Sequence, residues 1–143
     1  MTHRLLNPSA LHDPVSFGYS HLAVTDDWVF IAGQYASDAQ GNVTSADFAQ
    51  QVEQAFHNLK VALNAADAAP EHVVQLRTYV VDLGPERLGV LVRQIEGIWG
   101  AEPPTQTLLG VAGLALPGML FEVEAVAVND DTATGRANGS END

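Results

Sequence analysis

The sequence predicts an α+β fold in which two helices cover one face of a mixed β-sheet. Segments that alternate apolar and polar residues, as strands do, flank two segments with helical periodicity. Their order along the chain is β-β-α-β-α-β-β, and one layer of helices on one sheet is the arrangement that buries both apolar faces. A length of 143 residues suits one core. We therefore expect a single domain over residues 1–128, with no internal repeat.

The first part of the chain predicts an arm followed by a β-hairpin. Residues 1–15 contain two prolines and are expected to form a loose N-terminal arm. Phe17–Val24 is a short strand candidate, and Trp28–Ala32 is a buried strand candidate. Asp26-Asp27 between them is typical of a turn, so the two strands are expected to pair.

The first helix is expected to begin at Thr44-Ser45, with Asp47 in a capping-box position. It should end before Ala69-Pro70, because a residue that precedes proline disfavours the helical conformation. Its apolar stripe consists of Phe48, Val52, Ala55, Phe56, Leu59 and Leu63.

A third strand is expected over Val73–Leu83, and a second helix begins at Pro85, which suits the first helical position. Gly100 is a typical stop for that helix. Its apolar stripe consists of Leu88, Leu91, Val92, Ile95 and Trp99.

The chain closes with two strand-like segments, Thr105–Leu114 and Met119–Val128, joined at Pro117-Gly118. We expect these two segments to form a hairpin that is the spine of the sheet. In the second segment Glu122 and Glu124 fall on one face, opposite the apolar side chains. Residues 129–143 have no apolar residue other than alanine and are expected to form a disordered acidic tail.

Composition limits the classes of function. The chain has no cysteine, which excludes a disulfide framework, a thiolate metal site and a cysteine nucleophile. Its formal net charge is −12, and its six Lys and Arg residues do not cluster, which disfavours nucleic-acid binding. No apolar run approaches the roughly 20 residues that a membrane helix needs. Without a recognisable signal peptide, a cytoplasmic protein is expected.

Several short motifs resemble the Rid family, the reactive intermediate deaminases that are also called YjgF-like or L-PSP endoribonuclease-like proteins. The resemblance runs from about Pro8 to Val128. It depends on the order and spacing of its motifs, which are Gly18-Tyr19-Ser20, Ile31-Ala32-Gly33-Gln34, Asn58-Leu59-Lys60, Val81-Asp82-Leu83, Val111-Ala112-Gly113-Leu114 and Glu122-Val123-Glu124-Ala125.

The resemblance implies a chorismate-mutase-like fold and a homotrimer with a central barrel and three small-molecule clefts between subunits. Active members of the family hydrolyse imines or enamines to a carbonyl compound and ammonia. They need no cofactor, and no metal site is expected here. An arginine in a Pro-Ala-Arg-(Ser/Thr) motif holds the substrate carboxylate, and a glutamate on the last strand helps to place water.

Carried over to this chain, the family's tyrosine, glycine and glutamate fall on Tyr19, Gly33 and Glu122. Glu122 and Tyr19 are thus the candidate catalytic residues, and Gly33 and Gln106 the candidate substrate-binding residues. Gln106 stands where the family has its arginine, and the second-helix asparagine of active members falls near Val90 or Val92. Because glutamine lacks the charge and fork of arginine, a carboxylate should lose about 2–5 kcal/mol of binding energy.

Each candidate also has a plain structural interpretation. Glu122 and Glu124 are roughly 7 Å apart along a strand, which suits acid–base chemistry but equally suits two solvated side chains. His21 could act as a base or be a surface or interface residue. Arg77 could clamp an anion or form a structural salt bridge with one of the two glutamates. Gln106 could line a cleft or be an ordinary strand residue.

Two hypotheses of different classes remain open. The first is a Rid-like hydrolase in which Glu122, helped by Tyr19, orients water toward a neutral imine, enamine or related carbonyl-type ligand. Gln106 and backbone amides near Gly33 would hold that ligand. The second is a metabolite-binding or regulatory trimer that keeps the cleft and has lost the deaminase reaction.

Overall fold

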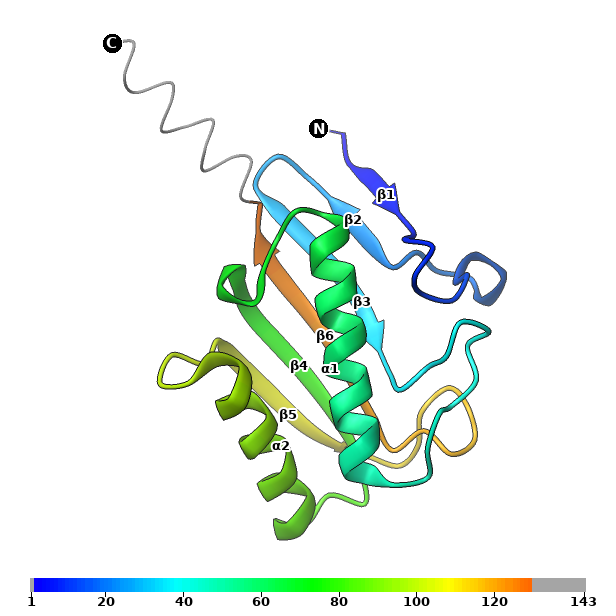
Figure 1. Ribbon diagram of the computed structural model, residues 1–143, viewed down its shortest axis with the longest axis vertical. Helices are drawn as coiled ribbons and strands as arrows, with labels where there is room; N and C mark the ends of the chain where they lie inside the picture. The colour runs from blue at the N-terminus through cyan, green and yellow to red at the C-terminus, as the bar shows by residue number, and fades with distance from the viewer. Residues whose placement is uncertain (1, 130–143) are drawn as a thin grey trace.

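The computed structural model describes residues 2–129, which form one six-stranded sheet with two helices on one side (Figure 1). The strands are β1 (Arg4–Leu6), β2 (Leu22–Val24), β3 (Trp28–Gln34), β4 (Val73–Val81), β5 (Thr105–Val111) and β6 (Phe121–Val128). The helices are α1 (Phe48–Ala65) and α2 (Pro85–Trp99), with short 3-10 turns η1 (Val15–Phe17) and η2 (Pro70–His72). The predicted α+β class is confirmed.

The strands lie in the order β1-β2-β3-β6-β4-β5. The predicted hairpin between Thr105–Leu114 and Met119–Val128 is wrong, because β4 lies between these two segments. β4 pairs in parallel with β5 and antiparallel with β6. Alternation identifies a strand but not its partner, and α2 supplies the long crossover that parallel pairing of β4 and β5 requires.

The N-terminal arm is more ordered than the sequence predicts, because Arg4–Leu6 forms β1 and pairs antiparallel with β2. The expected strand Phe17–Val24 is also shorter. Phe17 ends the turn η1, Gly18 has a left-handed φ of 88°, and the strand itself begins at Leu22. The predicted pairing of this strand with β3 is confirmed.

Helix α1 begins one turn later than predicted. Asp47 is itself the N-cap, and its carboxylate accepts a hydrogen bond from the backbone N–H of Gln50. Ser45, expected near the first turn, instead accepts from the N–H of Asp47 and donates to Gln50. Helix α2 has the predicted Pro85 at its start and Gly100 at its end.

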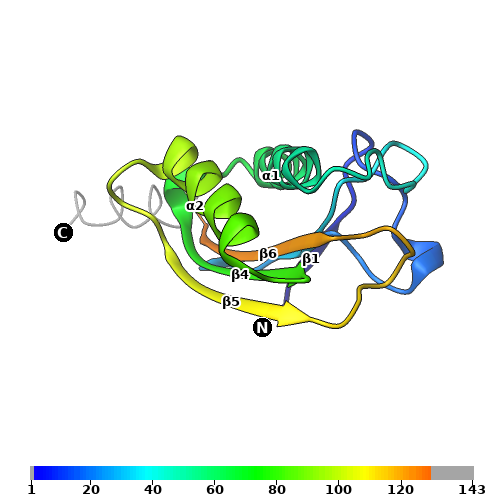
Figure 2. The same cartoon turned by 90° about the horizontal axis from the view of Figure 1, so that it is seen from below.

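The hydrophobic core lies between the helices and one face of the sheet (Figure 2). Alternate residues of β6 and β4 point into it, and α1 contributes the facing side chains. Its largest fully buried apolar side chains are Phe56, Phe121, Leu22, Leu59, Leu63, Leu76 and Leu91. The other face of the sheet has no helix over it (Figure 2), and it carries Trp28 and Phe30, which are 43% and 46% exposed.

Of the expected tail, only Asn129 belongs to the described residues. Asn129 is buried and held by hydrogen bonds to the backbone oxygens of Asp27 and Thr25. Residues 130–143, on which the prediction of a disordered tail mostly rests, lie outside the described part of the chain. Within residues 2–129, neither helix combines the length and apolar character that a bilayer-spanning segment requires.

Candidate functional site

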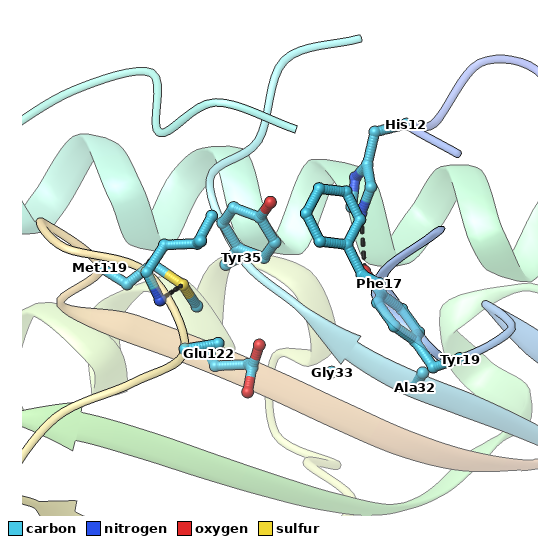
Figure 3. A pocket seen from close by; sticks show the side chains of 10 residues that line it. His12, Phe17, Tyr19, Ala32, Gly33, Tyr35, Met119 and Glu122 are labelled. Atoms are coloured by element: carbon cyan, nitrogen blue, oxygen red, sulfur yellow. Dashed lines mark hydrogen bonds between the residues drawn. The ribbon is translucent and has the colours of Figure 1, made fainter. Parts of the chain in front are cut away.

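A pocket of about 460 Å³ opens at the end of the sheet where β3 and β6 meet the loops that precede β2 and β6 (Figure 3). Segments far apart in the sequence build it: the N-terminal region, the end of β3, the loop before β6 and the start of β6. It is lined by His12, Phe17, Tyr19, Ala32, Gly33, Tyr35, Ala115, Leu116, Met119 and Glu122. Three of the four predicted site residues, Tyr19, Gly33 and Glu122, therefore share one pocket within a single chain.

Gly33 makes room for the carboxyl group of Glu122. A Cβ atom at position 33 would lie 2.6 Å from Cδ of Glu122 and 2.9 Å from its Oε1. Pairing is irregular here: Ile31 pairs with Ala125 and Gln34 with Val123, so β3 takes three steps where β6 takes two. Such a bulge re-aims side chains. Gly33 lies inside β3 and has no positive φ, so the close approach of Glu122 is what calls for a glycine at this position.

The Glu122 carboxyl group lies in the pocket without a hydrogen-bond partner among residues 2–129. Burial raises the pKa of this carboxyl above its ordinary value, and the nearby charge of Glu124 raises it further. A carboxyl with a raised pKa in a cleft is a candidate for proton exchange with a bound molecule.

The Tyr19 hydroxyl lies 2.6 Å from Nε2 of His12 (Figure 3). Burial, then Tyr35 and Glu122, raise the pKa of Tyr19 to about 12, so the hydroxyl stays protonated at neutral pH. The pKa of His12 is lowered, chiefly by burial and then by His21. Tyr19 and His12 are therefore a neutral pair, able to donate or accept one hydrogen bond but not to supply charge.

The proton on the buried His21 ring can be assigned from its partners. Nε2 of His21 lies 2.8 Å from the backbone oxygen of His12, an acceptor only, so Nε2 carries the proton. Nδ1 then accepts from the amide of Gln34 at 3.1 Å. Burial lowers the pKa of His21, in keeping with this neutral tautomer. His21 is fully buried rather than a surface residue, and it supports His12 from outside the pocket.

A second set of hydrogen bonds connects His12 to helix α1. Nδ1 of His12 lies 3.3 Å from Oγ of Ser37, and Ser37 accepts from the amide of Asn58 at 3.1 Å. Asn58 also donates to the backbone oxygen of Tyr35. The buried polar face of α1 thereby fixes the position of His12 and, through it, the hydroxyl of Tyr19.

Gln106 is not part of this pocket within one chain. It lies on the edge strand β5, is exposed, and accepts a hydrogen bond from Thr78 at 2.9 Å. The register pairs Gln106 with Leu76 on the helix-covered face, whereas Glu122 pairs with Tyr79 on the opposite face. A role for Gln106 beside Glu122 therefore requires a neighbouring copy of the chain, and it stays a prediction.

Glu124 lies two residues after Glu122 on β6, and the sequence suggested Arg77 as a salt-bridge partner for one of these two glutamates. Glu124 accepts a hydrogen bond from the Tyr79 hydroxyl. Arg77 pairs with Glu124 in the register and lines the same shallow hollow on the open face, together with Phe30. Among residues 2–129, no three His, Asp or Glu side chains gather as a metal ion would require.

Sequence reasoning missed two pocket residues, His12 and Tyr35, and most of the apolar wall. His12 lies in what was expected to be a loose arm, and no local pattern shows that its ring meets Phe17, Tyr19, His21 and Tyr35. The sequence does place four aromatic rings close together in a proline-containing segment, and this clustering could have indicated a shared site. The four residues are His12, Phe17, Tyr19 and His21.

Comparisons with known proteins agree with this fold. Residues 11–129 match the family described as Endoribonuclease L-PSP. The RutC family protein YjgH of Escherichia coli is 32% identical over 110 residues, covering 76% of this chain and 81% of the relative. A Yersinia pestis protein of the conserved Rid family, YyfB, is 39% identical with a TM-score of 0.67, covering 90% of this chain and 99% of that one.

A third similarity concerns the fold alone. The crystal structure of RidA from an Antarctic Psychrobacter has a TM-score of 0.79 at 24% identity, covering 87% of this chain and 98% of the other. The matched region contains both helices, all strands from β2 onward and every residue of the pocket. This chain therefore belongs to the Endoribonuclease L-PSP family and is a Rid/YjgF-like protein.

Proposed function

We propose that this chain is a Rid-like hydrolase that acts on a small imine or enamine without a carboxylate group. The observation that carries the proposal is Glu122, a carboxyl with a raised pKa and no hydrogen-bond partner within residues 2–129, in a pocket that also holds the Tyr19 hydroxyl. Membership of the family supports the reaction class, and the pocket supports the choice of residues.

In the proposed reaction Glu122 accepts a proton from water as the water oxygen bonds to the carbon of the C=N group. The same carboxyl returns that proton to the nitrogen, which gives a carbinolamine. Glu122 then accepts the hydroxyl proton of the carbinolamine and passes it to the nitrogen as the C=O bond forms and the C–N bond breaks, which releases a carbonyl compound and ammonia. Tyr19 orients the reactant through its hydroxyl, whose position His12 fixes. No oxidant, reductant or cofactor is needed to balance these steps.

The absence of a carboxylate from the substrate follows from the charges of the pocket. Its ten lining residues include no Lys or Arg, and the pKa of its one histidine is lowered. A carboxylate held there would face Glu122 without compensation, and like charges at short range in a cleft are strongly unfavourable.

The same proposal includes a homotrimer in which the pocket opens at a subunit boundary. In support, the edge strand β5 exposes Gln106 and Leu109, and the open sheet face exposes Trp28 and Phe30. Apolar edges and faces of this kind need a cover. Light scattering should give the mass of three chains, and a monomer at micromolar concentration would contradict this part.

The test of activity compares two imines generated in situ. An amine oxidase acting on a simple alkylamine supplies an imine without a carboxylate, and a serine dehydratase supplies 2-aminoacrylate. We expect the chain to accelerate ammonia release from the first and not from the second, and Glu122→Gln to remove the acceleration. Equal rates with and without protein on both would contradict the proposal. Acceleration on 2-aminoacrylate gained by Gln106→Arg would show that the family's reaction lacks only its anion clamp.

One observation favours a second function, binding without turnover. Within one chain, Gln106 lies on the face opposite Glu122. By the resemblance of the motifs it stands where the family has its arginine, which supports the loss of the reaction. A binding protein would show a thermal shift with a metabolite and no hydrolysis. A ligand present at 100 times its dissociation constant should stabilise the folded state by about 2.7 kcal/mol.

A further inference from the structure

The walls of the pocket combine one unpaired carboxyl group with several aromatic rings and no basic side chain other than a neutral histidine. We propose that this pocket binds a small organic cation, a protonated amine or imine without a carboxylate, whose N–H groups bond to Glu122 and whose charge lies against the aromatic rings. This inference extends the proposed function by naming the charge of the ligand. It depends on the proposed hydrolase activity only if the ligand is an imine.

The first argument is the state of Glu122 in the empty pocket. An ionised carboxylate accepts hydrogen bonds and donates none, and it has up to four acceptor positions. Among residues 2–129 none of these positions is filled by a protein donor. An ammonium or iminium group supplies N–H donors and the opposite charge together, the strongest class of hydrogen bond. A neutral alcohol supplies one donor and no charge.

The second argument is the nature of the remaining walls. Phe17, Tyr19 and Tyr35 line the pocket beside Glu122 (Figure 3). Their rings gather around His12, with ring centroids 6.1, 6.2 and 5.6 Å from that of His12. Aromatic faces attract cations through their quadrupole, and a carboxylate beside aromatic rings is the combination that recognises alkylammonium groups.

The third argument is that nothing on the walls opposes a positive charge at neutral pH. The pKa values of His12 and of His21 behind it are lowered by burial, so both rings are neutral. The groups that surround Glu122 are Glu124 on β6, Tyr79 across from it on β4, and Tyr19, Tyr35 and His12 around the pocket. The cation on the same face of β4 is Arg77, which pairs with Glu124 in the register and does not line the pocket.

Proton linkage gives the inference a signature of its own. The pKa of Glu122 is raised, so its carboxyl takes up a proton at a higher pH than an ordinary glutamate does. In the pH range where Glu122 is partly protonated, binding of a cation should therefore release protons and should weaken as the pH falls. A neutral ligand that needs no charge on Glu122 would show neither effect.

The experiment titrates the full chain with three probes of similar shape: isobutylammonium, isobutanol and isobutyrate. Binding is followed by chemical-shift changes of amide resonances between pH 5 and pH 8. At pH 7 we expect the ammonium to bind at least tenfold more tightly than the alcohol, and the carboxylate not to bind. The affinity for the ammonium should decrease as the pH is lowered from 8 to 5, and the affinity for the alcohol should stay the same.

Two variants locate the effect. Glu122→Gln keeps the shape of the side chain and removes its charge, so the preference for the ammonium should disappear while the alcohol still binds. The matched control is Glu124→Gln, on the same strand face but outside the pocket, which should keep the preference. Far-UV circular dichroism and melting temperature establish that both variants are folded.

Equal binding of ammonium and alcohol by the natural chain would overturn the inference, as would a preference that survives in Glu122→Gln. These outcomes are separable from failure of the proposed function. A chain that binds isobutylammonium but hydrolyses no imine keeps the inference and loses the enzyme, whereas one that hydrolyses imines without cation preference keeps the enzyme and loses the inference.

Discussion

Glu122 and Glu124 lie two residues apart on one strand and on one face of the sheet, yet they have different surroundings. Glu124 lies on β6 between the pairs Ile31–Ala125 and Gln34–Val123, opposite the bulge of β3, and the Tyr79 hydroxyl donates to it. Glu122 lies one residue beyond the last pair of β3 with β6, beside Gly33 and under the loop that precedes β6. Burial, and then the charge of Glu124, raises the pKa of Glu122.

The difference shows that the strand provides the carboxyl groups but its neighbours decide what each can do. Tyr79 is directly opposite Glu122 in the ladder of β4 and β6, yet its hydroxyl donates to the diagonal neighbour Glu124. On the side of β3, the missing side chain at position 33 leaves space beside Glu122, and no donor among residues 2–129 fills it. Four predictions test this comparison, and the one with the largest expected effect comes first.

The largest loss of stability should come from Phe121→Ala, which removes the core side chain that precedes Glu122 on β6. Phe121 is fully buried and contacts the rings of Phe48 and Phe56. Truncation of such a side chain costs about 3–5 kcal/mol because of the lost burial and the cavity left behind. Urea denaturation at fixed protein concentration measures the loss. A cost below about 1 kcal/mol would mean that the start of β6 does not depend on the core.

Gly33→Ala should damage the site while leaving the fold nearly intact. The new Cβ would overlap the carboxyl group of Glu122, and that flexible group can swing away while the backbone stays. Misplacement of a reacting group by about 1 Å can cost on the order of 100-fold in rate. Imine hydrolysis or ligand affinity should fall by that order, with a melting temperature close to that of the natural chain. Gly97→Ala, on an exposed turn of α2 with open space around it, is the matched control.

The pH dependence of stability should contain two opposing contributions. Burial lowers the pKa values of His12 and His21 below 6.5, so the unfolded chain binds more protons than the folded one, and their contribution is lost as the pH falls below about 6.5. The pKa of Glu122 is raised, so its contribution to stability is present at low pH and is lost as the pH rises through that raised pKa.

Two consequences follow for measurement. The free energy of unfolding of the natural chain should fall between pH 6.5 and pH 5. Glu122→Gln should be more stable than the natural chain at pH 7, because it removes a partly buried charge that has no hydrogen-bond partner within residues 2–129. Urea midpoints from pH 5 to pH 8 test both. A less stable Glu122→Gln at pH 7 would show that the carboxylate has a partner in the assembled protein.

The smallest effect is expected from Glu124→Gln. Glu124 is the second cause of the raised pKa of Glu122, after burial, so removing its charge should lower that pKa and leave the pocket in place. Stability should change by at most about 1 kcal/mol, since one partly exposed hydrogen bond with Tyr79 is weakened. Carbon-13 shifts of the labelled Glu122 carboxyl against pH measure the change. An unchanged pKa would mean that burial alone acts on Glu122.

Much of the framework could be predicted from the sequence, because it depends on local periodicity. The period of 3.6 placed α1 and α2, Pro85 and Gly100 marked the ends of α2, and alternation placed β3, β4 and β6. The candidate residues Tyr19, Gly33 and Glu122 also came from the sequence, through the order of short motifs. They share one pocket because the structure brings the end of β3 to the start of β6.

Partners along the sheet could not be predicted in the same way. The two C-terminal segments are close in sequence and separated by a Pro-Gly turn signal, yet β4 enters between them. Arg4–Leu6 is too short to show a period and becomes a strand only because the edge of β2 is available. The side of the sheet on which Gln106 lies could not be predicted either, because the register of β5 with β4 sets it and the local motif does not.

Periodicity and short motifs are enough to identify both helices, most of the strands, the acidic character of the chain and its family. They do not show that His12 positions Tyr19 or that the missing side chain of Gly33 leaves room for a carboxyl group. Nor do they show that, among residues 2–129, Glu124 has a hydrogen-bond partner and Glu122 has none. The physical reason is that periodicity is a property of neighbours in the chain. A hydrogen bond or a pKa shift is instead a property of neighbours in space, and the bulge of β3 and the register of the sheet choose those neighbours.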